Sequence, residues 1–174
     1  MKKIVVNDTN VFIDLYEVGL LDEFFSLPWE IHTTDFVMLE LLREGQHDTV
    51  ARYNADKRLI VPVFEAEELM EIGNLYQQNL NRTNLSFTDC SVWYYAKVNK
   101  YILLTGDRKL RTASVFDGVD VHGVIYVFDN LVELEIISRQ VAVEKLKQLY
   151  AINPRLPKEE IDKRINKWKA EIMK

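Results

Sequence analysis

Short apolar runs alternate along this chain with longer segments of helical periodicity. The runs KIVV, WEIHT, LIVPV, YILLT and VDVHGVIYVF are rich in β-branched and aromatic residues and are typical of strands. Between them, apolar residues recur every three or four positions, which predicts helices. Strands separated by helices need crossover connections, so this order predicts an α/β fold, a three-layer α/β/α sandwich with a central parallel sheet.

The pattern divides the chain into two parts. Residues 1–138 hold all the predicted strands, together with helices over about 10–27 (broken near Gly19), 35–44, 45–57, 65–80, 86–99, 107–116 and 129–137. Residues 139–174 predict only two helices, over about 139–150 and 158–173, joined at the turn NPRLP. We therefore expect an α/β domain followed by a C-terminal helical extension.

Composition narrows the class of protein. The chain has 174 residues, of which 48% are hydrophobic and 28% charged, as in an ordinary globular domain rather than a disordered segment. No apolar run approaches the roughly 18 residues that a membrane span needs. The single cysteine, Cys90, excludes an intrachain disulfide and a CxxC redox pair, so we expect a reducing, cytoplasmic setting.

Charge is distributed unevenly. The net charge of −5 argues against a nucleic-acid binder when it is taken as a sum. Residues 1–138 contain 12 basic and 22 acidic side chains, whereas residues 139–174 contain 10 basic and 5 acidic ones. The tail is interpreted either as a solvated amphipathic hairpin or as a basic surface facing RNA or a partner, which would use Lys163, Arg164, Lys167 and Lys169.

Two aspartates follow predicted strands. Asp8 comes directly after KIVVN, and Asp107 follows YILLT with only Gly106 between. The carboxyl ends of parallel strands meet at one edge of a sheet, where ligands of such folds gather, so both carboxylates are expected there. The alternative is that each caps the helix that follows it by accepting backbone N–H hydrogen bonds.

Two further acids precede or lie within apolar helices. Asp89 stands three residues after Ser86, the spacing of a capping box, at the start of a helix that is largely apolar. Glu40 is enclosed by FVML and LL, and a carboxylate in such surroundings is costly unless it is paired, hydrogen-bonded or bound to a cation. For Glu40 the alternative is a salt bridge to Arg43, one turn further on.

A single shared site explains the positions of these four acids better than four separate structural roles. Carboxylates that converge at a sheet edge repel one another unless a divalent cation neutralises them. The chain offers oxygen ligands, with no cysteine pair and with His32, His47 and His122 scattered, which favours Mg²⁺ or Mn²⁺ over zinc. Such a site orients water and stabilises charge during hydrolysis of a phosphodiester.

Four segments carry a resemblance to a known family. DTNVFIDL (8–15), FVMLEL (36–41), FTDCSVWYYA (87–96) and LLTGDRKL (103–110) occur in the order and approximate spacing of the PIN-domain nucleases. The sequence resembles above all the toxin, VapC-like members of VapBC-type toxin–antitoxin pairs. The resemblance covers about residues 3–130 and leaves the helical tail outside.

The resemblance implies a metal-dependent endoribonuclease. Asp8, Glu40, Asp89 and Asp107 match the family's acidic quartet. Asp8 and Asp107 would be the principal metal ligands, Asp89 would complete the shell directly or through water, and Glu40 would orient or deprotonate the attacking water.

Neighbouring polar positions are assigned in the same way. Thr9 or Asn10 matches the small polar residue that holds the first aspartate, and Thr105 matches the hydroxyl before the last one. Lys109 stands where some relatives carry a further acid. Because Arg108, Lys109 and Arg111 lie beside Asp107, they are expected to contact substrate phosphates.

Partners follow from the resemblance and from the apolar content. The substrate would be RNA, and an antitoxin protein is a further expected partner. The apolar stretches LLDEFFSL and VWYY exceed what a small body can readily bury, and members of the family commonly pair, so a homodimer is expected.

Two other classes of protein fit the sequence less well, whereas two alternatives on the same fold stay open. A receiver domain would want paired acids near the first strand and a lysine after a late strand. A phosphatase of the haloacid-dehalogenase type needs DxD, and Asn10 occupies the second acid position. A PIN nuclease that processes RNA without an antitoxin, or a PIN-like scaffold that only binds partners, would share the fold.

Overall fold

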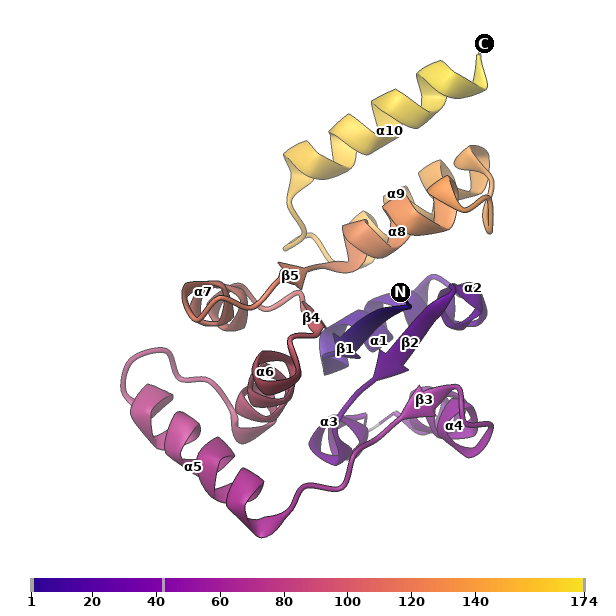
Figure 1. Ribbon diagram of the computed structural model, residues 1–174. Helices are drawn as coiled ribbons and strands as arrows, with labels where there is room; N and C mark the ends of the chain where they lie inside the picture. The colour runs from indigo at the N-terminus through magenta and orange to yellow at the C-terminus, as the bar shows by residue number, and fades with distance from the viewer. Residues whose placement is uncertain (1, 42, 174) are drawn as a thin grey trace. The chain divides into compact units, whose positions relative to one another are not determined.

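A five-stranded parallel sheet is the centre of the fold. The computed structural model of the chain describes residues 2–41 and 43–173 (Figure 1). The strand order is β3-β2-β1-β4-β5, with every neighbouring pair parallel. The strands are β1 (Lys3–Asn7), β2 (Trp29–His32), β3 (Leu59–Ile60), β4 (Ile102–Leu104) and β5 (Val121–His122). Val5 in the central strand lies opposite Ile31 on one side and Ile102 on the other.

Helices connect the strands. They are α1 (Thr9–Glu17), α2 (Leu21–Ser26), α3 (Asp35–Glu40), α4 (Glu44–Ala55), α5 (Ala66–Leu80), α6 (Phe87–Asn99), α7 (Arg108–Phe116), α8 (Val124–Glu133), α9 (Arg139–Ile152) and α10 (Lys158–Ile172). The crossovers run from β1 outward to β3, and then from β4 outward to β5 in the opposite direction. Right-handed connections in opposite directions place helices on both faces of the sheet, which confirms the predicted α/β/α sandwich.

The chain forms two compact units. The first contains residues 1–13 and 28–122, and therefore the sheet, the start of α1, and α3 to α7. The second contains residues 14–27 and 123–174. The predicted boundary between residues 138 and 139 falls inside this second unit. Among the described residues, none of the helices combines the length and the hydrophobicity that a membrane span requires.

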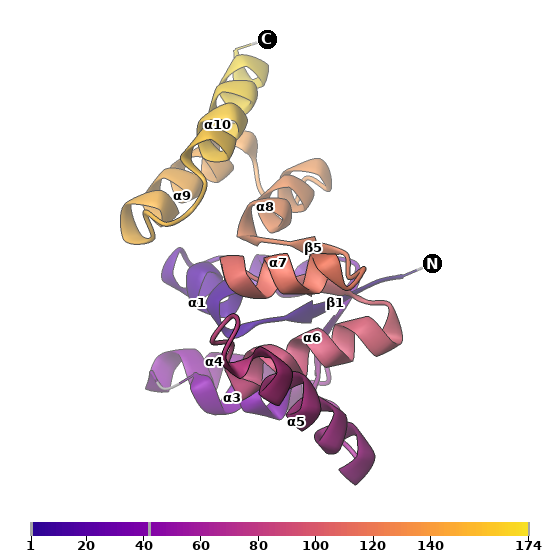
Figure 2. The same ribbon diagram turned by 90° about the vertical axis from the view of Figure 1, so that its left-hand side faces the viewer.

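Within the second unit, α9 and α10 form a helical hairpin (Figure 2). One stripe of α10, made of Ile161, Ile165 and Trp168, is buried, whereas its lysines are exposed. Arg164 forms ion pairs with Asp129 of α8 and with Glu160 one turn earlier. The two predicted helices of the tail are therefore confirmed, with an amphipathic pattern that buries one face of α10.

Two predicted strands are shorter in the structure than their apolar runs. The run over 59–63 forms only a two-residue strand, and Pro62 in that run has no N–H to continue a ladder. The run over 119–128 pairs only at Val121–His122, and α8 begins at Val124 directly after Gly123. Because α8 is buried on most of its circumference, its apolar residues form a continuous run, and such a run does not distinguish a strand from a buried helix.

The apolar stretches that suggested a homodimer are mostly buried within the chain. Leu21, Phe24 and Phe25 of the first stretch are at most 6% exposed, and Val92 and Trp93 of the second at most 5%. These five apolar side chains are therefore unavailable to a second copy. The homodimer stays a prediction that rests on the family resemblance alone.

Two glycines provide a test of this backbone. Gly19 ends α1 with a φ of +67°, as its predicted break requires, whereas Gly73 lies inside α5 with nothing within 4 Å of an added Cβ. Gly19→Ala should lower the free energy of unfolding by about 1 kcal/mol because an L side chain is strained there. Gly73→Ala should raise it by up to about 1 kcal/mol through helix propensity. Urea denaturation of the two variants measures both changes, and equal signs would contradict this local geometry.

Candidate active site

Asp8 is a buried carboxylate between β1 and α1. Its side chain is held by three donors: the backbone N–H of Thr9 donates to Oδ1 over 2.7 Å, and the Nδ2 of Asn10 and the hydroxyl of Thr105 each donate to Oδ2 over 2.7 Å. Only 2% of the residue is exposed. The strand therefore ends on an aspartate whose rotamer is fixed from three directions.

Burial dominates the acidity of Asp8. It raises the pKa of the carboxyl from 3.8 to about 7, because the charged form is removed from water. The hydrogen bonds from Thr105 and Thr9 act in the opposite direction, and the nearby charges of Asp89 and Glu40 add to the increase. Near neutral pH this group is poised between its two protonation states.

Asn10 connects Asp8 to the loop that carries Asp107. While its Nδ2 donates to Asp8, its Oδ1 accepts the backbone N–H of Gly106 over 2.7 Å. A Cβ on Gly106 would lie 3.1 Å from that Oδ1, so the close approach favours glycine. The hydroxyl of Thr105 accepts the backbone N–H of Asp107 over 3.0 Å and donates to Asp8. The polar residues predicted to support the site thus tie two of its acids together.

The capping interpretations of Asp107 and Asp89 are both correct. Oδ1 of Asp107 accepts the N–H of Leu110 in α7 over 2.8 Å. Asp89 and Ser86 form a reciprocal capping box, in which Oδ2 of Asp89 accepts the N–H of Ser86 over 2.7 Å. In each case only one carboxylate oxygen caps the helix. The other oxygen, Oδ2 of Asp107 or Oδ1 of Asp89, accepts no hydrogen bond within the described part of the chain.

Glu40 joins this edge from α3, but not in the surroundings that the sequence suggested. The expectation of burial among apolar side chains is wrong: α3 ends at Glu40, and both this residue and Leu39 are exposed. The predicted continuation of the helix crosses residue 42, which lies outside the described residues. Oε2 of Glu40 accepts the hydroxyl of Thr9 over 2.8 Å, and this bond brings α3 to the end of β1.

Two hydroxyls that the sequence did not single out fix the helices of the site. Thr34, the N-cap of α3, and Ser91 in α6 are buried and lie 2.9 Å apart through their side-chain oxygens. Ser91 also donates to the carbonyl of Thr88 over 2.7 Å, so Thr34 is the donor between the two hydroxyls. Only the N-cap position of Thr34 could have been predicted, because the second bond joins residues 57 apart.

The four carboxylates interact electrostatically. Burial is the largest cause that raises the pKa of Asp89, its hydrogen bonds with Ser86 lower it, and the charges of Asp107 and Glu40 raise it further. Asp8 in turn responds to Asp89 and Glu40. The charges of Glu40 and Asp89 act on Asp8, and those of Asp107 and Glu40 act on Asp89, so the four predicted acids lie near one another at this edge of the sheet.

The chemistry of this donor set suits a hard divalent cation. The four side chains provide only oxygen atoms, and Asp89, Asp107 and Glu40 each keep one oxygen that accepts no hydrogen bond from the described residues. Within residues 2–41 and 43–173, no group of three or more His, Cys, Asp and Glu side chains is arranged so that it could hold a metal ion. The fit therefore rests on donor chemistry and charge.

The three basic residues beside Asp107 differ in their surroundings. Arg108 and Lys109 are exposed in the first turn of α7 and line a groove. Arg111 is half-buried, and its guanidinium donates to the carbonyls of Val121 and Thr105, each over 3.0 Å. Burial lowers the pKa of Arg111. Its hydrogen bonds fix the ends of β4 and β5, so its observed contacts are with the backbone that carries the site.

Comparison with known proteins identifies the family. The family model described as PIN domain matches residues 4–170. This chain belongs to the PIN-domain family. The match extends beyond residue 130 and includes most of the helical tail, which the motif resemblance had left outside. None of the curated proteins matches the chain.

Solved structures resemble this chain at low sequence identity. The crystal structure of PAE2754 from Pyrobaculum aerophilum has a TM-score of 0.53 and 18% identity, and the alignment covers 79% of this chain and 100% of that one. VapBC2 from Rickettsia felis, bound to a DNA fragment from its promoter, has a TM-score of 0.47 and 15% identity over 69% of this chain and 98% of that one. The PilT N-terminus domain protein SSO1118 from Sulfolobus solfataricus has a TM-score of 0.46 and 11% identity over 75% and 94%.

The acidity of Asp8 predicts how stability depends on pH. Well below pH 3.8 the carboxyl is protonated in both the folded and the unfolded chain. Between the unfolded pKa of 3.8 and the folded pKa of about 7, the unfolded chain loses its proton first, so the free energy of unfolding falls as pH rises. In EDTA-treated protein Asp8 should contribute a decrease of about 4 kcal/mol, because a difference of one in pKa between the two states corresponds to about 1.4 kcal/mol.

The variant Asp8→Asn isolates this contribution. It should raise the melting temperature at pH 8, where the ionised carboxylate is buried, and change it little at pH 3, where Asp8 is neutral in both the folded and the unfolded chain. Asp14, whose pKa burial raises to about 6, remains in both proteins and cancels in the difference. Calorimetry in EDTA measures the effect, and a lower melting temperature at both pH values would assign Asp8 a purely structural role.

Proposed function

We propose that this PIN-domain protein is a metal-dependent endoribonuclease that hydrolyses RNA phosphodiester bonds with the help of Mg²⁺ or Mn²⁺. The observation that carries the proposal is the convergence of Asp8, Glu40, Asp89 and Asp107 at the carboxyl edge of the sheet. Burial and mutual repulsion make this arrangement unfavourable for the folded chain. A structural role for the four acids would not require them to be brought together, whereas cation binding does.

Each acid is assigned a role that fits its contacts. Asp8 and Asp107 would be the principal ligands of the cation, and Asp89 would complete the shell directly or through water. The bonds from Leu110 to Asp107 and from Ser86 to Asp89 hold one oxygen of each carboxylate and aim the other. A bound divalent cation would supply the positive charge that stabilises the phosphodiester during hydrolysis.

Glu40 is proposed to act on the attacking water. It is the exposed member of the quartet, so water and substrate can reach it, and Thr9 fixes its position by donating to Oε2. Its Oε1 accepts no hydrogen bond within the described residues and can accept a proton from water. Thr9, Asn10 and Thr105 would position the acids without touching the substrate.

The proposal predicts that cleavage depends on these carboxylates. Asp8→Asn, Glu40→Gln and Asp107→Asn should each slow cleavage of single-stranded RNA by about 100-fold or more, because each removes a charge that orients or activates a reacting group. The assay incubates labelled RNA with purified protein in Mg²⁺ or Mn²⁺ and measures the rate of product formation. EDTA should abolish the activity.

Asp14→Asn is the matched control. Asp14 is also a buried aspartate with a raised pKa, and it lies on the same helix as Thr9, but its partner is Asn153 of the second unit. Its substitution should leave the cleavage rate within about twofold of the wild type. Cleavage that survives EDTA or Asp8→Asn, or that falls equally in Asp14→Asn, would contradict the proposed mechanism.

We further propose that the nuclease is the toxin of a toxin–antitoxin pair. The support is the order and spacing of the four segments that resemble VapC-like toxins, beginning with DTNVFIDL. Expression of the wild-type chain in a bacterial host should then arrest growth, and expression of Asp8→Asn should not. Growth counts with and without the product of the adjacent open reading frame measure the effect. Arrest by both forms would show that the toxicity does not come from cleavage.

A further inference from the structure

A basic groove lies beside the acidic edge in the first unit. It has a volume of about 770 Å³ and is lined by the end of α5, the loop over 81–84, α6 and α7. Four of its lining residues are basic: Arg82, Lys97, Arg108 and Lys109. Asp117 is the one acidic residue that lines it in the described chain, and it is paired with Lys97 at 2.6 Å. In a chain of net charge −5, this concentration of positive charge matches a polyanion.

The positions of the basic residues favour an anionic ligand. Arg108 and Lys109 occupy the first turn of α7, where the helix dipole already provides partial positive charge. Cationic side chains in that turn destabilise the helix. A bound anion would neutralise the partial positive charge of the dipole and reduce the repulsion between that charge and the two cations. The side chains of Arg82, Arg108 and Lys109 form no ion pair or hydrogen bond within the described part of the chain. They are therefore available to phosphates.

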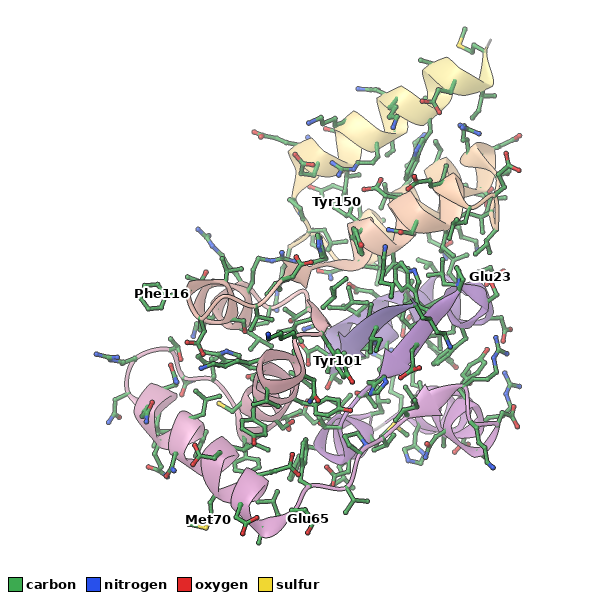
Figure 3. The ribbon with its side chains drawn as sticks, in the orientation of Figure 1. Glu23, Glu65, Met70, Tyr101, Phe116 and Tyr150 are labelled. Carbon is green, nitrogen blue, oxygen red and sulfur yellow. The ribbon has the colours of Figure 1, made fainter. Side chains whose placement is uncertain are left out.

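Aromatic residues complete the groove. Phe116 at the end of α7 is 94% exposed and extends away from its helix (Figure 3). It has no ring contact with the aromatic residues that the structure describes. Trp93 on the wall is 5% exposed, and its indole N–H lacks an acceptor among the described residues. An exposed ring beside unpaired cations is the arrangement that single-stranded nucleic acids use, with bases stacked and phosphates neutralised.

We propose that this groove binds a single-stranded stretch of nucleic acid that flanks the scissile bond. Backbone phosphates would lie on Arg82, Arg108 and Lys109, and an unstacked base would lie on Phe116. The groove begins at Arg108, the residue after Asp107, so a strand held there leads directly to the acidic edge. The direction of the strand rests on the proposed function, whereas the binding itself does not. A duplex presents no free base face to Phe116 and fits poorly.

Binding without turnover tests the groove. The probe is a fluorescein-labelled oligouridylate of about twelve nucleotides, and its affinity is measured by fluorescence anisotropy in EDTA over a series of salt concentrations. Arg82→Glu and Lys109→Glu should each weaken binding roughly tenfold or more and reduce the slope of log K against log salt, by about 0.7 for each phosphate that the variant no longer neutralises. Phe116→Ala should weaken binding roughly tenfold with the slope unchanged, because it removes stacking but no charge.

Matched controls come from the rest of the chain. Lys147→Glu reverses an exposed charge on α9, and Met70→Ala truncates an apolar side chain on α5 that is 68% exposed. Both should bind the oligonucleotide within about twofold of the wild type. Equal losses in Lys147→Glu and Lys109→Glu, an unchanged affinity in Phe116→Ala, or equal affinity for an RNA duplex would overturn the proposal.

The outcomes separate this inference from the nuclease mechanism. Loss of affinity in the groove variants together with cleavage that is independent of Asp8 would keep the binding site and overturn the proposed function. Unchanged affinity in the groove variants together with cleavage that requires Asp8 would overturn the groove and keep the chemistry. An oligonucleotide that fails to bind the wild-type protein at low salt would assign the groove to another anionic partner and overturn the inference.

Discussion

The buried carboxylate of Asp8 is the interaction on which the rest of the site depends. Three donors converge on it, and they come from the residue after it, from Asn10 and from Thr105 at the end of β4. Through Thr105 and Asn10, the same contacts position the loop that carries Asp107. Through Thr9, the first turn of α1 also positions Glu40. A single ionisable group thus joins segments that are far apart in sequence.

In the proposed function, the substrate would bind to one surface and react at a neighbouring surface of opposite charge. The acidic edge repels a polyanion unless its charge is compensated, and the groove beside it attracts one. Arg111 does not add to this attraction directly, because its guanidinium is bound to the carbonyls of Thr105 and Val121. The charge of Arg111 therefore has a structural role, and the positive charge available to a substrate lies in the preceding helical turn, at Arg108 and Lys109.

Much of this architecture could be predicted because local patterns agreed with the tertiary structure. The break at Gly19, the caps at Ser86 and Asp107, and the two tail helices all depend on residues close in sequence. The predictions failed where tertiary packing, rather than local sequence, determines the structure. The run from Val124 to Phe128 is apolar enough for a strand but forms a buried helix, and Glu40 is exposed because α3 ends there.

The site could be predicted only in part, for the same reason. Three of the acids were recognisable from their places after strands and at a helix start, and Glu40 from its apolar neighbours in sequence, whereas the hydroxyl contact between Thr34 and Ser91 has no local signature. The groove was equally hidden, because its basic residues come from α6, α7 and the loop before α6.

Because Asp89 and Asp107 also form capping bonds, the integrity of the site depends on the first turns of α6 and α7. Each of these acids is also the group that satisfies a free backbone N–H at the start of its helix, α6 or α7. Helix ends open far more often than whole domains unfold, and an opened first turn releases the carboxylate with it. Under the proposed function, brief fraying that a melting curve does not detect would interrupt cleavage reversibly. The thermal limit of its activity would be set by two helix starts, below the temperature at which the sheet itself comes apart.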